Sequence, residues 1–282
     1  MSIDGRTELY GIIGNPVRHS LSPAMHNAGF ATMGMNWIYV PMEVTDIEQA
    51  ITGLRALGFN GVSVTVPFKE SVIPFLDEID PVAEQIGAVN TLLFRKDRTG
   101  KVILRGFNTD WLGANTAIAD KIKLQNTRVL IVGAGGAAKA VAFGLVQAGA
   151  EVVIANRTRA KGEKLADWLG CQCVDLGEQE DFRADVLINT TSVGMEPDFD
   201  QTPVRADILS RFSVVMDIVY APLETRLLRE AKTSGCETID GLSMLLYQGA
   251  AQFKIWTGGH PPQLIMRSAL EEELRIRNVS IR

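Results

Sequence analysis

Four short segments in the first 110 residues carry polar side chains that a plain hydrophobic core would not need. Alternation along a strand places Ser63 and Thr65 on one side, at the carboxyl end where α/β proteins bind ligands. Taken singly, each segment has a plainer interpretation. Ser22 before Pro23 suits a helix N-cap, Asn and Asp are ordinary turn residues, and a lone lysine such as Lys69 is usually a surface residue. The segments are Asn15–Pro23, Ser63–Lys69, Gly87–Thr91 and Gly106–Asp110.

A glycine-rich turn follows the apolar run Val129–Val132 and precedes a helical pattern. Its spacing is G-x-G-x-x-A, with Gly133, Gly135 and Ala138 at the defined positions. Gly133 permits a tight turn, and Gly135 lets the backbone approach a pyrophosphate whose charge then lies at the helix N-terminus. The flanking elements favour a dinucleotide site over a turn without a ligand.

The end of the next predicted strand, Glu151–Ala155, indicates which dinucleotide would bind. NAD-binding versions place Asp or Glu there to bind the ribose hydroxyls. This chain has Asn156 instead, followed by the cations Arg157, Arg159 and Lys161. Arginine offers a planar set of donors and lysine a point charge for a 2′-phosphate. We therefore predict NADP rather than NAD, the alternative being a solvated, charged start of a helix.

The elements that position these groups alternate between strand-length apolar runs and helical patterns, which predicts βαβ units and parallel sheets. A boundary between two domains is expected near Asp110–Asn126, and the pattern after about Gly241 is helical. Strands are predicted at Leu9–Ile13, Trp37–Val40, Gly61–Val66, Val89–Phe94, Val129–Val132, Val152–Ala155, Val186–Asn189 and Val214–Val219. Helices are predicted at Ile47–Leu57, Trp111–Ile122, Ala137–Gln147, Ala160–Trp168 and Glu224–Thr233.

Length and composition bound the functional classes. The chain has 282 residues, 46% hydrophobic and 22% charged, with a net charge of −5, which argues against a nucleic-acid partner. The N-terminus lacks the layout of a secretion signal, and no stretch suits a membrane span, so we expect no membrane partner. An odd number of cysteines fits a reducing cytoplasm, and their spacing from the histidines disfavours a metal site.

Seven motifs, taken together and in order, resemble the shikimate dehydrogenase family over nearly the whole chain. One departure is Ser63, where many members carry Asn, a change that could slightly alter hydrogen bonding near the substrate. The motifs are SLSP (20–23), VTVPFK (64–69), GAVNT (87–91), NTD (108–110), GAGGA (133–137), NRT (156–158) and DGLSMLLYQGA (240–250).

The resemblance implies an α/β chain with two domains and an active site in the cleft between them. An N-terminal α/β substrate domain would comprise residues 1–110, joined by C-terminal helices at 246–282, and a Rossmann-type doubly wound NADP domain would comprise residues 111–245. The family reversibly reduces 3-dehydroshikimate to shikimate with NADPH, in the pathway to aromatic amino acids. The implied partner is this small-molecule substrate, and the chain is expected to be a monomer or a homodimer.

The resemblance also assigns the site residues. Lys69 and Asp110 would be the catalytic pair. Our hypothesis is that Lys69 exchanges the proton while Asp110 orients Lys69 and the substrate hydroxyl, the alternative being that the pair exchanges the proton as a unit. The substrate would be held by Ser20, Ser22, Thr65, Lys69, Asn90, Asp110, Tyr220 and Gln248. The cofactor would be lined by Gly133, Ala134, Gly135, Gly136, Ala137, Asn156, Arg157, Thr158, Arg159, Lys161, Ile218 and Gly241.

Two other classes of function remain open on the sequence. A quinate/shikimate dehydrogenase using NAD, or an aminoshikimate enzyme, would share these motifs. A non-catalytic NADP-binding protein could also use the same fold, because fold does not fix function. Such a sensor would not need both Lys69 and Asp110.

Overall fold

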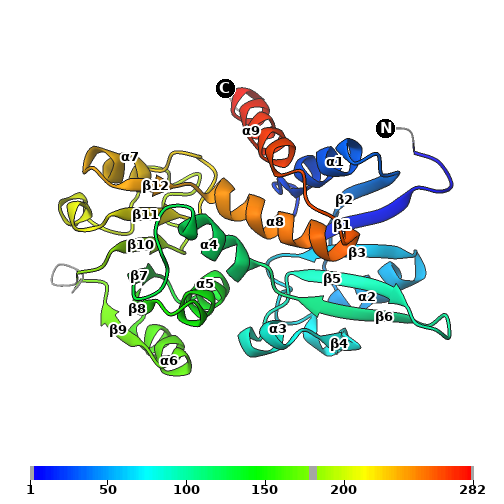
Figure 1. Cartoon of the computed structure of the whole chain (residues 1–282), viewed down its shortest axis with the longest axis horizontal. Coiled ribbons are helices and arrows are strands. Elements are labelled where there is room, and N and C mark those ends of the chain that lie inside the picture. The colour runs from blue at the N-terminus through cyan, green and yellow to red at the C-terminus, as the bar shows by residue number, and fades with distance from the viewer. Residues whose placement is uncertain (1–2, 178–182, 281–282) are drawn as a thin grey trace. The chain divides into compact units, whose positions relative to one another are not determined.

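The computed structural model describes residues 3–177 and 183–280 and divides into two compact units (Figure 1). The first unit is formed by residues 1–109 together with 248–282, and the second by residues 110–247. Each unit is built on its own six-stranded sheet flanked by helices. The predicted α/β class with two domains is therefore confirmed.

The sheet of the first unit has the order β2-β1-β3-β5-β6-β4. β1 is parallel to β2 and β3, whereas β5 runs antiparallel to both β3 and β6. The alternation of strand and helix patterns in the sequence predicted parallel strands only. The antiparallel pair of β5 and β6 was missed because the two strands are joined by a short turn and not by a helix. The strands are β1 (Glu8–Gly14), β2 (Trp37–Glu43), β3 (Phe59–Val64), β4 (Glu78–Ile79), β5 (Thr91–Lys96) and β6 (Val102–Phe107).

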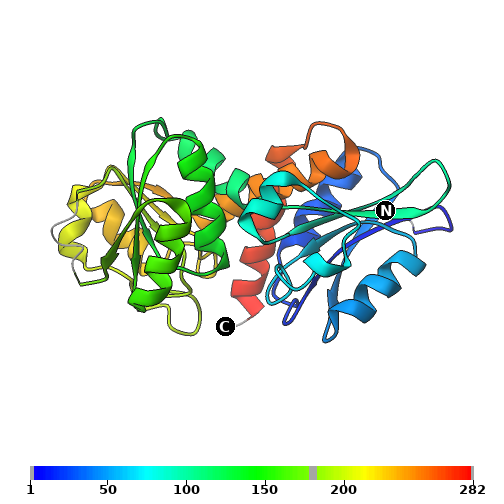
Figure 2. The same ribbon diagram turned by 90° about the horizontal axis from the view of Figure 1, so that it is seen from below.

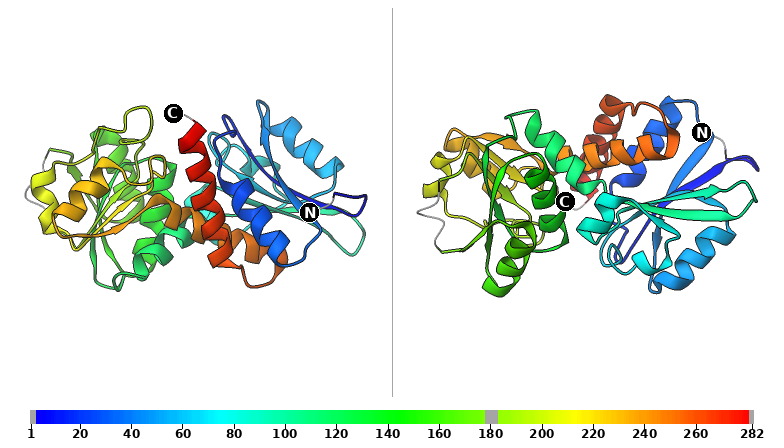
Figure 3. Two further views of the ribbon diagram at one scale, coloured as in Figure 1. Left: turned by 90° about the horizontal axis from the view of Figure 1, so that it is seen from above. Right: turned by 60° about the horizontal axis from the view of Figure 1, so that its bottom comes forward.

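Helices cover both faces of this sheet (Figure 3). On one face Ile51 and Leu54 of α2 join a core with Val62 and Leu92 of the strands. On the other face α1 and α9 lie side by side. The helices of this unit are α1 (Ser22–Thr32), α2 (Ile47–Ala56), η1 (Ile73–Phe75), α3 (Pro81–Ile86) and α9 (Gln263–Ser280), and α8 (Gly241–Thr257) enters it from residue 248.

The sheet of the second unit has the order β12-β11-β10-β7-β8-β9, with every adjacent pair parallel. Counted from β7, this is the doubly wound order of dinucleotide-binding folds, whose ligand crevice lies where the order reverses between β7 and β10. Its strands are β7 (Arg128–Val132), β8 (Glu151–Asn156), β9 (Gln172–Asp175), β10 (Val186–Asn189), β11 (Val214–Asp217) and β12 (Glu237–Ile239). Its helices are α4 (Asp110–Ala119), α5 (Gly136–Gln147), α6 (Arg159–Leu169), η3 (Ala206–Arg211) and α7 (Arg226–Thr233).

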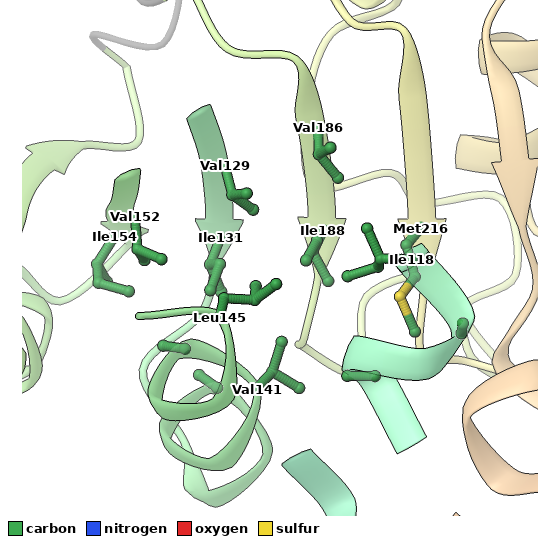
Figure 4. Close-up of a cluster of buried hydrophobic side chains, with 14 of the residues drawn as sticks. Ile118, Val129, Ile131, Val141, Leu145, Val152, Ile154, Val186, Ile188 and Met216 are labelled. Carbon is green, nitrogen blue, oxygen red and sulfur yellow. The ribbon is translucent and has the colours of Figure 1, made fainter. Parts of the chain in front are cut away.

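Central strands of the second sheet are buried on both faces, which explains their continuous apolar runs. Val129 and Ile131 of β7 pack with Val141 and Leu145 of α5 in one core (Figure 4). The alternate residues of β7 join a second core with α7 on the opposite face, and Figure 2 shows helices on both sides of this sheet. The glycine-rich turn after β7 is thus held on a rigid support.

Candidate functional site

The loops that follow β1 and β3 are tied together by backbone hydrogen bonds. Asn15 donates its N–H to the carbonyl of Val66 at 3.0 Å, and Thr65 donates to the carbonyl of Ile13 at 2.9 Å. Gly14 lies so close to Thr65 that a Cβ on the glycine would come within 2.3 Å of the threonine methyl carbon. The polar segment after β1 therefore lies beside the one after β3, as parallel neighbours require.

The two serines of this region have roles that differ from the helix-cap interpretation. The N-cap of α1 is Leu21, with no side-chain cap hydrogen bond, so the cap interpretation of Ser22 is wrong. Instead the Ser20 hydroxyl accepts the backbone N–H of Ser22 at 3.2 Å. The side chain of Ser22 is buried and contacts the hydroxyl of Tyr39.

Arg277 of α9 fixes the same loop from the other end of the chain, which the sequence did not reveal. Its guanidinium donates to the carbonyl oxygens of His19 at 2.7 Å and Ser20 at 3.0 Å. Glu273, one turn earlier, accepts a third bond from the same group at 2.8 Å. Sequence pattern alone assigns such an arginine to a solvated helix face, because its partners are backbone atoms distant in sequence.

Asn90 and Gln248, two of the residues assigned to the substrate, lie in contact with each other. Asn90 donates its amide to Gln248 Oε1 at 3.4 Å and to Thr109 Oγ1 at 3.0 Å, and its Oδ1 accepts the backbone N–H of Thr109 at 2.8 Å. All three side chains are buried. Asn108 is also buried and donates to the carbonyl of Ala88 at 3.0 Å, which fixes the NTD segment beside the GAVNT segment. The left-handed residue Gly87, at φ 68°, ends α3 and directs the chain into this turn.

Lys69 and Asp110 are anchored to these same segments. The carbonyl of Lys69 accepts the N–H of Val89 at 2.7 Å, one residue before Asn90. Asp110 directly follows Thr109, is 7% exposed and begins α4. Tyr220, the remaining residue assigned to the substrate, is half-buried in the loop after β11 in the second unit.

The turn after β7 has the geometry that a pyrophosphate requires. Gly133 has φ 119°, and a Cβ there would come within 2.5 Å of Thr190 Oγ1 on the neighbouring loop after β10. A Cβ on Gly135 or Gly136 would meet no atom within 4 Å, so this side of the turn is open. Gly136 begins α5, whose first backbone N–H groups have no partner within the helix. The turn therefore fits a dinucleotide phosphate.

The cations after β8 are not equivalent. Arg157 and Lys161 are exposed, and Asn156 turns its amide to the carbonyl of Thr158 at 2.8 Å. The guanidinium of Arg159 instead donates to Glu163 and Asp175, each at 2.8 Å. Asp175 ends β9 directly opposite Asn156, so a carboxylate does lie near this strand end, paired with Arg159. The sequence missed this carboxylate because it belongs to the adjacent strand.

The loop after β11 is held by a buried carboxylate. Asp217 accepts hydrogen bonds from Val219 N at 3.0 Å, Thr225 Oγ1 at 2.7 Å and Asn189 Nδ2 at 3.0 Å. Burial raises the pKa of Asp217 to about 6. Gly241 packs on the far side of this loop, where a Cβ would come within 2.5 Å of the Ile218 carbonyl. Two residues assigned to the cofactor, Ile218 and Gly241, are thus neighbours.

The residues that the structure describes, 3–177 and 183–280, also bear on metal binding and membrane insertion. They contain no group of three or more His, Cys, Asp or Glu that could hold a metal ion. No helix in the same ranges is long and apolar enough to cross a membrane.

The doubly wound unit with its open glycine turn, and the polar cluster of the other unit, define a dinucleotide-dependent α/β oxidoreductase. Family models match at residues 12–92 (shikimate dehydrogenase substrate binding domain), 116–206 (shikimate/quinate 5-dehydrogenase) and 241–271 (shikimate 5′-dehydrogenase C-terminal domain). The chain belongs to the shikimate dehydrogenase family, and this prediction is confirmed.

Individual relatives match over nearly their full length. A shikimate dehydrogenase (NADP(+)) of Thermococcus kodakarensis is 49% identical, covering 95% of this chain and 98% of the relative. A shikimate dehydrogenase solved in complex with NADP+ is 42% identical with a TM-score of 0.91, covering 97% of this chain and 98% of the other. The Thermus thermophilus enzyme, solved with NADP(H) and shikimate, is 39% identical with a TM-score of 0.84, covering 94% of this chain and 99% of the other.

Proposed function

We propose that this protein reversibly reduces 3-dehydroshikimate to shikimate with NADPH, and that Lys69 and Asp110 form its acid–base pair. The proposal assigns substrate binding to residues 1–110 with 246–282, and NADP binding to residues 111–245. One observation carries it. Amides and hydroxyls from three separate segments converge in a buried cluster around Asn90 and Gln248. Burying so many polar groups is costly unless they are paired, which suits recognition of a polyhydroxylated substrate.

Each polar side chain of the cluster has a role toward the substrate in this proposal. Shikimate offers several ring hydroxyls and a carboxylate. Asn90, Gln248 and Thr65 would pair with ring hydroxyls, and the hydroxyls of Ser20 and Ser22 would bind the carboxylate. A substrate analogue lacking one hydroxyl would leave a buried polar group unpaired, so such a site discriminates strongly. Tyr220 would complete the set from the second unit.

The cofactor would be held by groups with distinct tasks. The turn from Gly133 to Ala137 would bind the pyrophosphate, and Arg157 with Lys161 would bind the 2′-phosphate. Thr158 and Arg159 would flank this phosphate, and Ile218 and Gly241 would line the nicotinamide end. When bound, the nicotinamide supplies or accepts the hydride. The relatives named above carry NADP in their names or titles, in agreement with the NADP prediction.

The protein must supply the proton that accompanies hydride transfer. In the reducing direction, protonated Lys69 would donate from Nζ to the carbonyl oxygen of 3-dehydroshikimate. In the oxidising direction, the neutral amine would take the proton from the same hydroxyl. Asp110 would orient both the amine and that hydroxyl through hydrogen bonds. The proposal also places the enzyme in the cytoplasm, where its free cysteines Cys171, Cys173 and Cys236 would stay reduced.

An initial-rate assay with two acids and two cofactors tests the function. Purified protein is mixed with shikimate or quinate, each with NADP+ or NAD+, and the absorbance of the reduced cofactor is followed. We expect the highest kcat/KM for shikimate with NADP+. A preference for quinate with NAD+ would favour the related dehydrogenase activity, and binding of NADP+ without turnover of either acid would indicate a non-catalytic protein.

A further inference from the structure

A continuous chain of buried hydrogen bonds lies behind the substrate cluster and includes four residues with no assigned role. The Tyr39 hydroxyl donates to Ser63 Oγ at 2.7 Å, and Ser63 Oγ donates to Gln252 Oε1 at 2.9 Å. Gln252 Nε2 donates to Thr91 Oγ1 at 3.0 Å, and Thr91 Oγ1 donates to Asn90 Oδ1 at 2.7 Å. Each of these side chains is at most 4% exposed.

Backbone groups fix the orientation of the Gln252 and Asn90 amides in this chain. Gln252 Nε2 also faces the carbonyl oxygen of Asn90 at 3.2 Å, and a carbonyl can only accept, so the amide of Gln252 has one allowed orientation. Thr91 Oγ1 accepts from that amide and donates its own proton to Asn90 Oδ1 at 2.7 Å. The backbone N–H of Thr109, which can only donate, contacts the same Oδ1 atom at 2.8 Å.

The orientation of Asn90 follows from these constraints. Because Thr91 Oγ1 and the Thr109 N–H both donate to Oδ1, the amide nitrogen of Asn90 is the atom that donates to Thr109 Oγ1 at 3.0 Å and to Gln248 Oε1 at 3.4 Å. If the Asn90 amide were flipped, its NH₂ group would face two other donors, the Thr91 hydroxyl and the backbone N–H of Thr109. Asn90 therefore presents a hydrogen-bond donor, and not an acceptor, on the side where Gln248 lies.

His26 supports the other end of the Gln252 amide. Its Nε2 lies 3.3 Å from Gln252 Oε1, and burial lowers the pKa of His26 to about 3, so the ring is neutral. Since Oε1 can only accept, the proton of the neutral ring is on Nε2. Ser63 and His26 thus hold one end of the Gln252 amide, and Thr91 and the Asn90 carbonyl hold the other.

We propose that Gln252 and Thr91 are positioning residues that lock the Asn90 amide as a hydrogen-bond donor to the substrate. Gln252 lies one helical turn after Gln248 on α8, so a single helix carries both an assigned substrate residue and the group that orients its partner Asn90. The inference rests on the proposed function, because it assumes that Asn90 binds shikimate. It adds a set of residues that determine substrate affinity without contacting the substrate.

The test compares Thr91→Val with Thr91→Ser. Valine has nearly the shape of threonine and suits a strand but lacks the hydroxyl, whereas serine keeps it. For Thr91→Val we expect KM for shikimate to rise by about tenfold, the usual order for one lost buried hydrogen bond, while KM for NADP+ stays within about twofold. Thr91→Ser should restore KM for shikimate to within about threefold of wild type.

Trp256→Phe is the matched control. Trp256 lies one turn beyond Gln252 on α8 and donates a buried hydrogen bond to the carbonyl oxygen of Leu92 at 3.0 Å. Leu92 follows Thr91 in the chain, but this bond does not involve Asn90. This variant should lose thermal stability and keep KM for shikimate. If it raises KM as much as Thr91→Val does, the effect is general destabilisation and the positioning role is refuted. If Thr91→Val does not fold, Gln252→Met, which removes both amide groups, must show the same selective rise.

Wild-type protein assayed in parallel separates the two claims. If it does not reduce NADP+ in the presence of shikimate, the proposed function fails, and the positioning role fails with it. If wild type turns over shikimate normally while Thr91→Val keeps the wild-type KM, only the positioning role is refuted.

Discussion

Arg157 and Arg159 are two residues apart on the same predicted phosphate-binding segment, yet the structure predicts losses of different size for their removal. Both side chains are exposed, but the guanidinium of Arg159 is held at 2.8 Å by both Glu163 and Asp175. A charge-assisted hydrogen bond to a phosphate contributes roughly 1.5–3 kcal/mol, or about 10- to 150-fold in kcat/KM. We therefore expect Arg157→Ala to lower kcat/KM for NADP+ by that factor and to leave kcat/KM for NAD+ nearly unchanged.

Arg159→Ala should lower kcat/KM for NADP+ by less than about fivefold, because an exposed ion-paired group contributes little. Its main consequence is that Asp175, opposite Asn156, loses the cation that neutralises it. The double variant Arg159→Ala/Asp175→Asn should then recover most of the lost NADP+ efficiency. The assay is the initial rate at saturating shikimate with each cofactor varied. Equal losses in Arg157→Ala and Arg159→Ala would refute this division of roles.

Three further predictions concern pH, backbone strain and the loop that carries Ser20 and Ser22. The raised pKa of Asp217, about 6 against 3.8, means that ionisation destabilises the fold, so wild type should lose about 2 kcal/mol of unfolding free energy relative to Asp217→Asn as the pH rises from 4 to 7. Denaturant titration at both pH values checks this, and a pH-independent difference would contradict it. Gly133→Ala forces a side chain into φ 119°, which should lower the unfolding free energy by about 1–3 kcal/mol, and an unchanged melting temperature would refute it. Arg277→Met removes the bonds to the carbonyl oxygens of His19 and Ser20, in the loop that carries Ser20 and Ser22. This change should raise KM for shikimate about three- to tenfold, with little change in KM for NADP+. If Arg277→Met changed KM for shikimate and KM for NADP+ equally, a local role of Arg277 at the substrate loop would be excluded.

In the second unit, the four central strands β7, β8, β10 and β11 were predicted because they are buried and read as continuous apolar runs, whereas the edge strands β9 and β12 were missed. The strand prediction Val186–Asn189 matches β10 at both ends, and the glycine turn lies between β7 and α5 as expected. In the first unit, β4 and α3 were missed because a two-residue strand and a six-residue helix leave too little periodicity to detect. The six-residue strand β6 was also missed.

The polar positions of the candidate site were visible in the sequence, but their partners were not. Ser22 reads locally as a helix cap, and only the fold shows that Tyr39 lies beside it. Gln252 could have been noticed because it follows Gln248 by four residues on a helix, which places both on one face. Arg277 and Asp175 had no such signal, because their contacts join segments that only the tertiary structure brings together.

The account depends most on the proton being carried by Lys69. The direct test is kcat and KM for shikimate with NADP+ in wild type and Lys69→Ala. We expect robust wild-type turnover, a fall in kcat of roughly 10²–10⁴ in the variant, and a much smaller change in KM. Near-normal turnover by Lys69→Ala, or no wild-type turnover of shikimate, would contradict the account.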